Sequence, residues 1–412
     1  MAVVKPFRAL RPNPAYADQI ADLPYDVMSS AEARMMVQDK PHSFLRIDRA
    51  EINFPEPVDP YQPQVYAKAA SILQQMITQE LYQLESSECF YVYRQIMDGR
   101  TQTGLVCTTA VDDYINDVIK KHEHTHPDKE MDRAAHIEAV GAHTGPILQT
   151  YPDQEQITAI IENWINTHQP VYQFTAYGVE QICWVIEAPE VIAELQSLFA
   201  AVPHLYIADG HHRSAAALRV AQKKRRENPD CGSSEEFNYF LSVLFPASQL
   251  RIMAYNRVVR DLGGLKDEEF LEKIRERFVL DSAPAAPYAP EAPHQFGMYF
   301  RGKWFKLTAK PEYIPEQDPV NRLDAAILQS NLLAPVLGIL DPRTDKRIEF
   351  IGGIRGLGEL ERRVNDDMQI AFALYPTSVA DVMRVADAGL VMPPKSTWFE
   401  PKLLSGLFIH LI

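Results

Sequence analysis

The stretch His204-Leu-Tyr-Ile-Ala-Asp209-Gly-His-His-Arg213, followed by Ser214-Ala-Ala-Ala-Leu-Arg-Val-Ala221, carries the clearest local signal of the fold. Its first five residues are mostly apolar and predict a strand. Its last eight residues are mostly strong helix formers, and the residues between the two runs are polar. The sequence therefore predicts a strand that enters a polar turn, with a helix beginning directly after the turn.

The turn at residues 209–213 has the chemistry of an anion site. The unpaired N–H groups of a first helical turn and the positive end of the helix dipole attract anions. Gly210 lets the backbone approach a ligand closely, because glycine has no Cβ. Arg213 adds a bidentate donor, while His211 and His212 add donors or proton carriers. The alternative is that Asp209 only caps the helix, with both histidines packed or facing water.

Length and composition exclude several classes of protein. A chain of 412 residues is long enough for two domains, and 46% hydrophobic with 23% charged residues is ordinary for a globular protein. The net charge of −14 argues against nucleic acid or an anionic membrane as a partner. The four cysteines form no Cys-x-x-Cys pair, which argues against a structural zinc knuckle and favours a reducing compartment.

The N-terminal residues lack the apolar core of a signal peptide, and the chain has no run of about 18 apolar residues that could span a membrane. We therefore expect a cytoplasmic protein with no membrane partner. The composition is also compatible with a homodimer.

Proline-rich stretches and alternating elements suggest the domain organisation. Residues 53–63 predict a loop, and residues 89–110 predict a hairpin around a Gly-containing turn. The stretch 283–293 is the best candidate for a linker, so we expect one domain over residues 1–282 and an α/β layered domain over residues 283–412. The alternation of strands and helices predicts an α/β or α+β architecture.

A second polar motif lies at Lys121-His-Glu-His-Thr-His126. His122, Glu123 and His126 have the spacing of a zinc-binding helix, in which the glutamate acts as a base. However, Pro127 follows directly and disfavours a helical conformation at His126. A zinc hydrolase is therefore kept only as an alternative.

A role in phosphoryl transfer suits this segment better. Glu123 could be a general base or a ligand of a divalent cation, and His122 and Thr125 could contact substrate anions. The alternative is an exposed polar loop. We interpret most charged residues of the following helix, 128–140, as surface residues, and the basic run 223–226 as the solvated end of the helix that follows Arg213.

A third motif lies near the C-terminus. Lys395, Ser396 and Thr397 lie in a stretch bounded by prolines, which predicts a shaped loop that closes on a substrate. The alternative is that the aromatic pair after Thr397 simply covers the edge of a sheet.

Together these motifs resemble a known family. The chain carries Pro24-Tyr-Asp-Val27, Lys121-His-Glu-x-Thr125, Tyr206-Ile-Ala-Asp-Gly-His-His-Arg213 and Lys395-Ser-Thr-Trp-Phe-Glu-Pro-Lys402. This combination resembles a widespread bacterial "domain of unknown function" family that is related to the free serine kinases. Its Asp-Gly-His-His-Arg turn is similar to that of the ParB/sulfiredoxin-like superfamily, in which a comparable turn contacts nucleotide phosphates. The resemblance implies such a fold for the N-terminal part.

The resemblance also implies a function, which is phosphotransfer between ADP or ATP and a free hydroxyl amino acid, L-serine above all, with Mg²⁺ as cofactor. The reverse reaction would dephosphorylate O-phosphoserine. The residues expected to be catalytic are Asp209, Glu123 and His212. The residues expected to bind phosphate or nucleotide are Gly210, His211, Arg213, His122 and Thr125. Mg²⁺ would lie on Glu123 and Asp209. A nucleotide-binding regulatory protein is the other alternative, and it predicts affinity for nucleotide without turnover.

Overall fold

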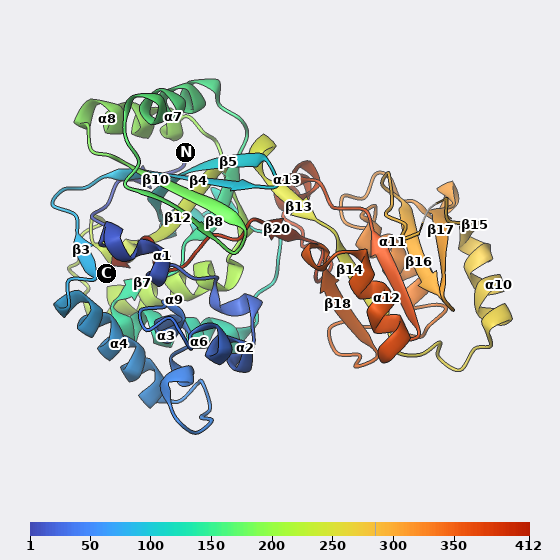
Figure 1. Cartoon of the computed structure of the whole chain (residues 1–412). Coiled ribbons are helices and arrows are strands. Elements are labelled where there is room, and N and C mark those ends of the chain that lie inside the picture. The colour runs from blue at the N-terminus through green and yellow to red at the C-terminus, as the bar shows by residue number, and fades with distance from the viewer. Residues whose placement is uncertain (285) are drawn as a thin grey trace. The chain divides into compact units, whose positions relative to one another are not determined.

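The computed structural model describes residues 1–284 and 286–412, which form two compact units. The first unit contains residues 1–250 and 401–412, and the second contains residues 251–400. In Figure 1 the second unit carries the yellow to red part of the chain.

A large mixed sheet forms the centre of the first unit. Its strands, in their order across the sheet, are β6 (Ile119–Lys120), β11 (Leu205–Asp209), β8 (Ile147–Tyr151), β12 (Tyr239–Pro246), β5 (Arg100–Ala110), β4 (Phe90–Met97), β10 (Val179–Ile186) and β9 (Tyr172–Ala176), and β1 (Val4–Lys5) pairs with β5. Strand β11 is parallel to β6 and antiparallel to β8, whereas β12 is parallel to β8. The predicted hairpin over residues 89–110 is confirmed as β4–β5.

Helices cover this sheet. They are α1 (Ala17–Ile20), α2 (Ser30–Met36), α3 (Leu45–Asp48), α4 (Pro63–Thr78), α5 (Val111–Ile115), α6 (Pro127–Val140), α7 (Glu155–Thr167), α8 (Pro189–Ala200) and α9 (His211–Glu227). Figure 1 shows α7 and α8 together at one side of the sheet, away from the group formed by α3, α4, α6 and α9. The core between sheet and helices includes Trp164, Phe199 and Phe240, all buried. Two short strand pairs, β2 (Leu10–Pro12) with β3 (Tyr82–Leu84) and β7 (Ala142–His143) with β21 (His410–Leu411), complete the unit.

The basic run 223–226 closes α9 as predicted. The helix ends at Glu227, and its last turn holds Lys224, Arg225 and Arg226, where cations complement the helix dipole. Lys223 forms an ion pair with Glu138 at 2.8 Å, in keeping with a solvated helix surface.

The second unit has an antiparallel sheet with helices. Across the sheet the strands are β15 (Phe278–Ser282), β17 (Lys303–Ala309), β16 (Gln295–Phe300), β19 (Ile370–Leu374), β14 (Tyr255–Val259) and β18 (Ile348–Gly352), and a separate pair joins β13 (Arg251–Met253) to β20 (Trp398–Glu400). The helices are α10 (Asp267–Arg277), α11 (Asp324–Leu328), which continues as a π-helical turn over Gln329–Leu333, α12 (Leu357–Asp366) and α13 (Val379–Asp387). The mixed α/β class predicted from the sequence is confirmed.

The units divide the chain at different places from the predicted boundary at 282/283. That boundary lies inside the second unit, directly after β15, which pairs along its length with β17. The proline-rich stretch 283–293, in which residue 285 lies outside the described residues, therefore joins two strands of one sheet. In addition, residues 401–412 belong to the first unit, where β21 pairs with β7. Proline content marks an irregular segment and does not show which core the flanking strands join.

Across the described residues, every helix is too short or too polar to cross a lipid bilayer.

Candidate functional site

The predicted strand, turn and helix are confirmed as β11, Gly210 and α9. Gly210 is the N-cap residue of α9 and has a φ angle of 103°, a conformation that side chains strongly disfavour. A Cβ at this position would lie 3.4 Å from both Arg213 Nε and Ile147 Cγ1. Glycine is therefore favoured by the backbone conformation, whereas the contacts of an added Cβ would be ordinary van der Waals contacts.

Asp209, at the end of β11, is held by Lys402. Lys402 Nζ donates to Asp209 Oδ2 at 3.0 Å, and the two side chains are 13% and 30% exposed. Burial alone would raise the pKa of the Asp209 carboxyl, but Lys402 and Arg213 hold it well below its usual range. No side chain caps α9. The alternative in which Asp209 only caps the helix is therefore wrong.

Arg213, in the first turn of α9, is a partly buried cation whose Nε is buried and has spare hydrogen-bonding capacity. Its Nη1 donates to the carbonyl oxygen of Pro146, while its Nε makes no hydrogen bond within the described part of the chain. Burial alone would lower its pKa, but the Asp26 and Asp209 carboxylates raise it above its usual value. The guanidinium is therefore a fixed charge that can still donate to a ligand.

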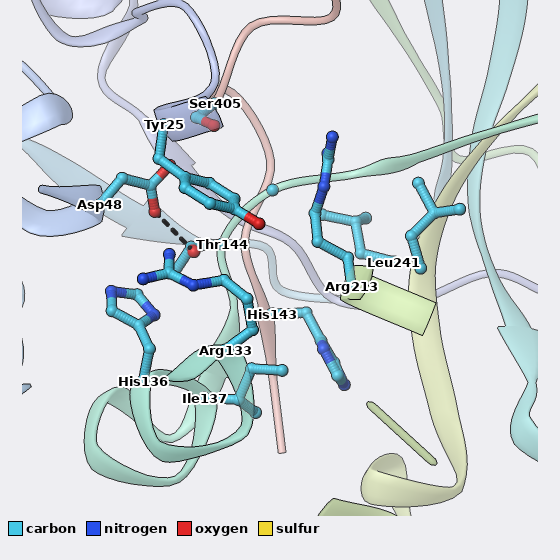
Figure 2. A pocket seen from close by; sticks show the side chains of 12 residues that line it. Tyr25, Asp48, Arg133, His136, Ile137, His143, Thr144, Arg213, Leu241 and Ser405 are labelled. Carbon is cyan, nitrogen blue, oxygen red and sulfur yellow. Dashed lines mark hydrogen bonds between the residues drawn. The ribbon is translucent and has the colours of Figure 1, made fainter. Parts of the chain in front are cut away.

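A small pocket with a cavity volume of about 30 Å³ lies beside Arg213. Its lining residues are Tyr25, Asp48, Arg133, His136, Ile137, His143, Thr144, Gly145, Ile147, Arg213, Leu241 and Ser405, all of the first unit. Figure 2 shows the Tyr25 hydroxyl between the guanidinium groups of Arg133 and Arg213. Both cations oppose the rise in the pKa of Tyr25 that burial and Asp26 cause. The pocket therefore combines two guanidinium groups and the Asp48 carboxylate with hydroxyl groups.

Arg133 is an exception among the charged residues of α6, most of which were interpreted as surface residues; Asp128, Lys129 and Glu138 are exposed. The Arg133 guanidinium lies 4.0 Å from the centre of the Tyr25 ring, and its side chain is only 12% exposed. It also pairs with Asp132 at 2.8 Å. Across the pocket wall, Thr144 Oγ1 donates to Asp48 Oδ1 at 2.9 Å (Figure 2). Sequence reasoning missed Arg133, Asp48 and Thr144, because these residues lie far apart in the sequence.

A second cluster brings His122 and Glu123 to the start of α9. Strand β6 runs parallel to β11, with Lys120 opposite Tyr206, so the residues after both strands meet at the same sheet edge. The rings of His122 and His211 are 4.4 Å apart and perpendicular, and Glu123 Oε2 lies 3.6 Å from His211 Nδ1. Burial lowers the pKa of His122 to about 4 and the pKa of His211 well below its usual value.

The other residues of the motif at 121–126 lie apart from this cluster. His126, the N-cap residue of α6, has extended backbone and a side chain that is 66% exposed, so His122 and His126 do not share a helix face. Among the described residues, the group that could hold a metal ion contains His122, Glu123 and His211, so the predicted zinc ligand His126 is wrong. Thr125 Oγ1 donates to Glu130, and His212 Nε2 accepts the His126 amide at 3.1 Å.

The predicted substrate loop belongs to the second unit. Ser396 Oγ donates to the carbonyl oxygen of Pro393 at 2.7 Å, and Lys395 has a φ angle of 57°. Lys395 Nζ lies 5.6 Å from the centre of the Tyr255 ring in the same unit. Its role in substrate binding, with that of Thr397, stays a prediction.

Fold and site together define a mixed α/β protein with a cation-lined pocket at the start of a helix. The chain belongs to the family described as "Protein of unknown function (DUF1015)", which matches residues 4–326. The predicted family relationship is confirmed to that extent, and membership of the ParB/sulfiredoxin-like superfamily stays a prediction. No curated protein matches the sequence.

Several solved structures are weakly similar to this chain. A free serine kinase variant in complex with AMP has 14% sequence identity and a TM-score of 0.36, covering 74% of this chain and 89% of that one. SbnI with a C-terminal truncation from Staphylococcus aureus has 14% identity and a TM-score of 0.38, covering 74% and 87%. A conserved hypothetical protein from Pyrococcus furiosus has 13% identity and a TM-score of 0.34, covering 75% and 95%. Likenesses this weak do not bear on function.

Proposed function

We propose that the protein is a phosphotransferase that acts between a nucleotide, ADP or ATP, and a small hydroxyl amino acid, L-serine above all. The observation that supports the proposal most strongly is the position of Arg213 and its unpaired Nε. This partly buried arginine lies in the first turn of α9, lines the pocket and has a buried Nε with no hydrogen-bond partner among the described residues. A fixed cation at a helix N-terminus suits a phosphoryl group, because this chemistry depends mainly on positioning and charge stabilisation.

Each residue of the turn has a role in this proposal. Arg213 and the first N–H groups of α9 bind the phosphoryl oxygens, and Gly210 keeps the backbone open to them. Lys402 keeps Asp209 ionised, so that Asp209 and Arg213 stay in fixed positions. Glu123, with a side chain that is 46% exposed, accepts the proton of the substrate hydroxyl.

The predicted Mg²⁺ site on Glu123 and Asp209 does not fit the donor atoms present. Asp209 is bound by Lys402, and Glu123 lies beside two imidazole rings. Mg²⁺ prefers oxygen ligands in octahedral geometry, and it is commonly held by substrate phosphates. Mg²⁺ therefore enters the proposal only as the counter-ion of the nucleotide phosphates, and no step depends on these two carboxylates holding it.

The test is direct observation of product. The protein is incubated with L-serine, Mg²⁺ and either ADP or ATP, and ³¹P NMR is used to detect O-phosphoserine, with the reverse mixture run in parallel. We expect turnover with one nucleotide and its loss in the variant Arg213→Ala. The matched control is Arg226→Ala, which removes an exposed arginine from the other end of the same helix. Full activity of Arg213→Ala would contradict the proposal, while nucleotide binding without turnover would favour a regulatory protein.

A further inference from the structure

His122 is a buried polar side chain whose ring contacts that of His211 and is influenced by the Ile207 backbone. It is 1% exposed, and neither Nδ1 nor Nε2 makes a hydrogen bond of normal geometry within the described part of the chain. Buried polar side chains are nearly always hydrogen-bonded, so both nitrogens of this imidazole have capacity for a further ligand. Because an imidazole lone pair is a good metal ligand, a metal ion is one such group.

Two further donors converge on the same point. Ligand atoms of His122, Glu123 and His211 all lie within 4.8 Å of one another. The rings of His122 and His211 are perpendicular, and their centres are 4.4 Å apart. Both histidines are buried, whereas the Glu123 side chain is 46% exposed and gives solvent access to the cluster. The parallel pairing of β6 with β11 fixes this meeting of two distant segments.

The chemistry of these donors selects a class of metal. Two neutral imidazoles and one carboxylate suit borderline divalent ions such as Zn²⁺, Co²⁺, Mn²⁺ and Fe²⁺, whereas Mg²⁺ and Ca²⁺ favour all-oxygen sites. We propose that His122, His211 and Glu123 bind one divalent transition-metal ion and leave its remaining positions open to water or an anion. This proposal goes beyond the phosphotransferase proposal and does not rest on it.

Binding requires one rearrangement at His211. Its Nε2 accepts the amide N–H of His122 at 3.4 Å, and its Nδ1 faces Glu123. Coordination through Nδ1 moves the ring proton to Nε2, so this contact with the His122 amide has to open. A distance of 3.4 Å is long for a hydrogen bond of this kind, so the contact given up is a weak one.

The test uses Co²⁺ alone, because its visible absorption reports the ligands directly. Chelator-treated protein, without nucleotide or serine, is titrated with CoCl₂ and then with ZnCl₂. We expect one Co²⁺ per chain, a visible band that saturates at that ratio, and displacement of Co²⁺ by Zn²⁺. The variants His122→Gln and Glu123→Gln should each weaken binding by about tenfold or more. The control, His126→Gln, changes an exposed histidine of the same segment and should bind as the unmodified chain does.

Three results would overturn the proposal: no stoichiometric Co²⁺ binding, unchanged binding in both His122→Gln and Glu123→Gln, or equal loss of binding in His126→Gln. Circular dichroism shows whether each variant is folded. Should His122→Gln fail to fold, Glu123→Gln still decides the question, because its side chain is partly exposed. The metal titration contains no nucleotide or serine, so its result does not depend on whether the protein phosphorylates serine.

Discussion

Lys402 Nζ donates to Asp209 Oδ2 at 3.0 Å, although the two residues are 193 positions apart. This ion pair joins the C-terminal segment to the turn that begins α9. It places a lysine next to the candidate anion site, and it keeps the Asp209 carboxyl ionised. The C-terminal segment is therefore part of the site in the first unit.

Removal of Lys402 should destabilise the protein. Lys402→Met leaves the Asp209 carboxylate partly buried without its cation, at a cost of about 1–3 kcal/mol in the free energy of unfolding. Because Lys402 lowers the pKa of Asp209 in the folded state, the stability that the pair contributes is present above the unfolded pKa of about 4 and is lost as pH falls below it. Urea denaturation at several pH values measures both effects. The double variant Lys402→Met/Asp209→Asn should recover part of the loss, and additive effects would show that the pair is not coupled.

Replacement of Gly210 should affect both stability and anion binding. Gly210→Ala places a Cβ at a φ of 103°, which costs about 1–2 kcal/mol, and the Cβ would lie in van der Waals contact with Arg213 Nε, where it covers the atom offered to an anion. Gly178→Ala is a matched control, because Gly178 also has positive φ but nothing within 4 Å of the added Cβ. Thermal melts and ADP titrations should show a loss of stability in both variants and a loss of affinity in Gly210→Ala alone. Equal ADP affinity of the Gly210→Ala and Gly178→Ala variants would mean that Gly210 is needed for its backbone conformation and not for anion binding.

The Tyr25 ring should contribute to stability through Arg133. The guanidinium lies 4.0 Å from the ring centre, so Tyr25→Phe keeps the cation–π contact. We expect Tyr25→Leu to lose about 1–2 kcal/mol more than Tyr25→Phe in urea denaturation. The same loss in an Arg133→Met background would show that the effect is unrelated to Arg133.

Buried His143 should make the first unit sensitive to acid. Burial, together with nearby His410, lowers the pKa of His143 to about 3. Since its unfolded pKa is about 6.5, the unfolded state binds the proton first, and stability should fall as pH drops below that value. The effect is on the order of a few kcal/mol by pH 4. His143→Gln should reduce this dependence in thermal melts without abolishing it, because burial also lowers the pKa values of His122 and His211. Exposed His126→Gln should leave the dependence as it is. A dependence in His143→Gln equal to that of the unmodified chain would assign it to the other histidines.

The local signals of the sequence predicted the turn correctly, because a strand, a glycine and a helix start depend on neighbouring residues. The hairpin β4–β5 and the end of α9 were predictable for the same reason. Arg133 and Lys402 were not, because their roles depend on Tyr25 and Asp209, which are distant in the sequence. The grouping of His122 with His126 was wrong for a related reason: spacing along the chain pointed to His126, whereas the parallel pairing of β6 with β11 brings His211 to His122. The domain boundary could not be predicted, because it depends on the pairing of β15 with β17, a strand beyond the proline-rich stretch.

We propose that Arg213 at the start of α9 binds a phosphoryl group. Isothermal titration of ADP into the unmodified chain, Arg213→Met and Arg226→Met tests this binding without requiring turnover. We expect Arg213→Met to weaken ADP binding by about tenfold or more, while Arg226→Met binds as the unmodified chain does. Equal affinity of all three proteins for ADP would show that Arg213 does not bind the phosphoryl group.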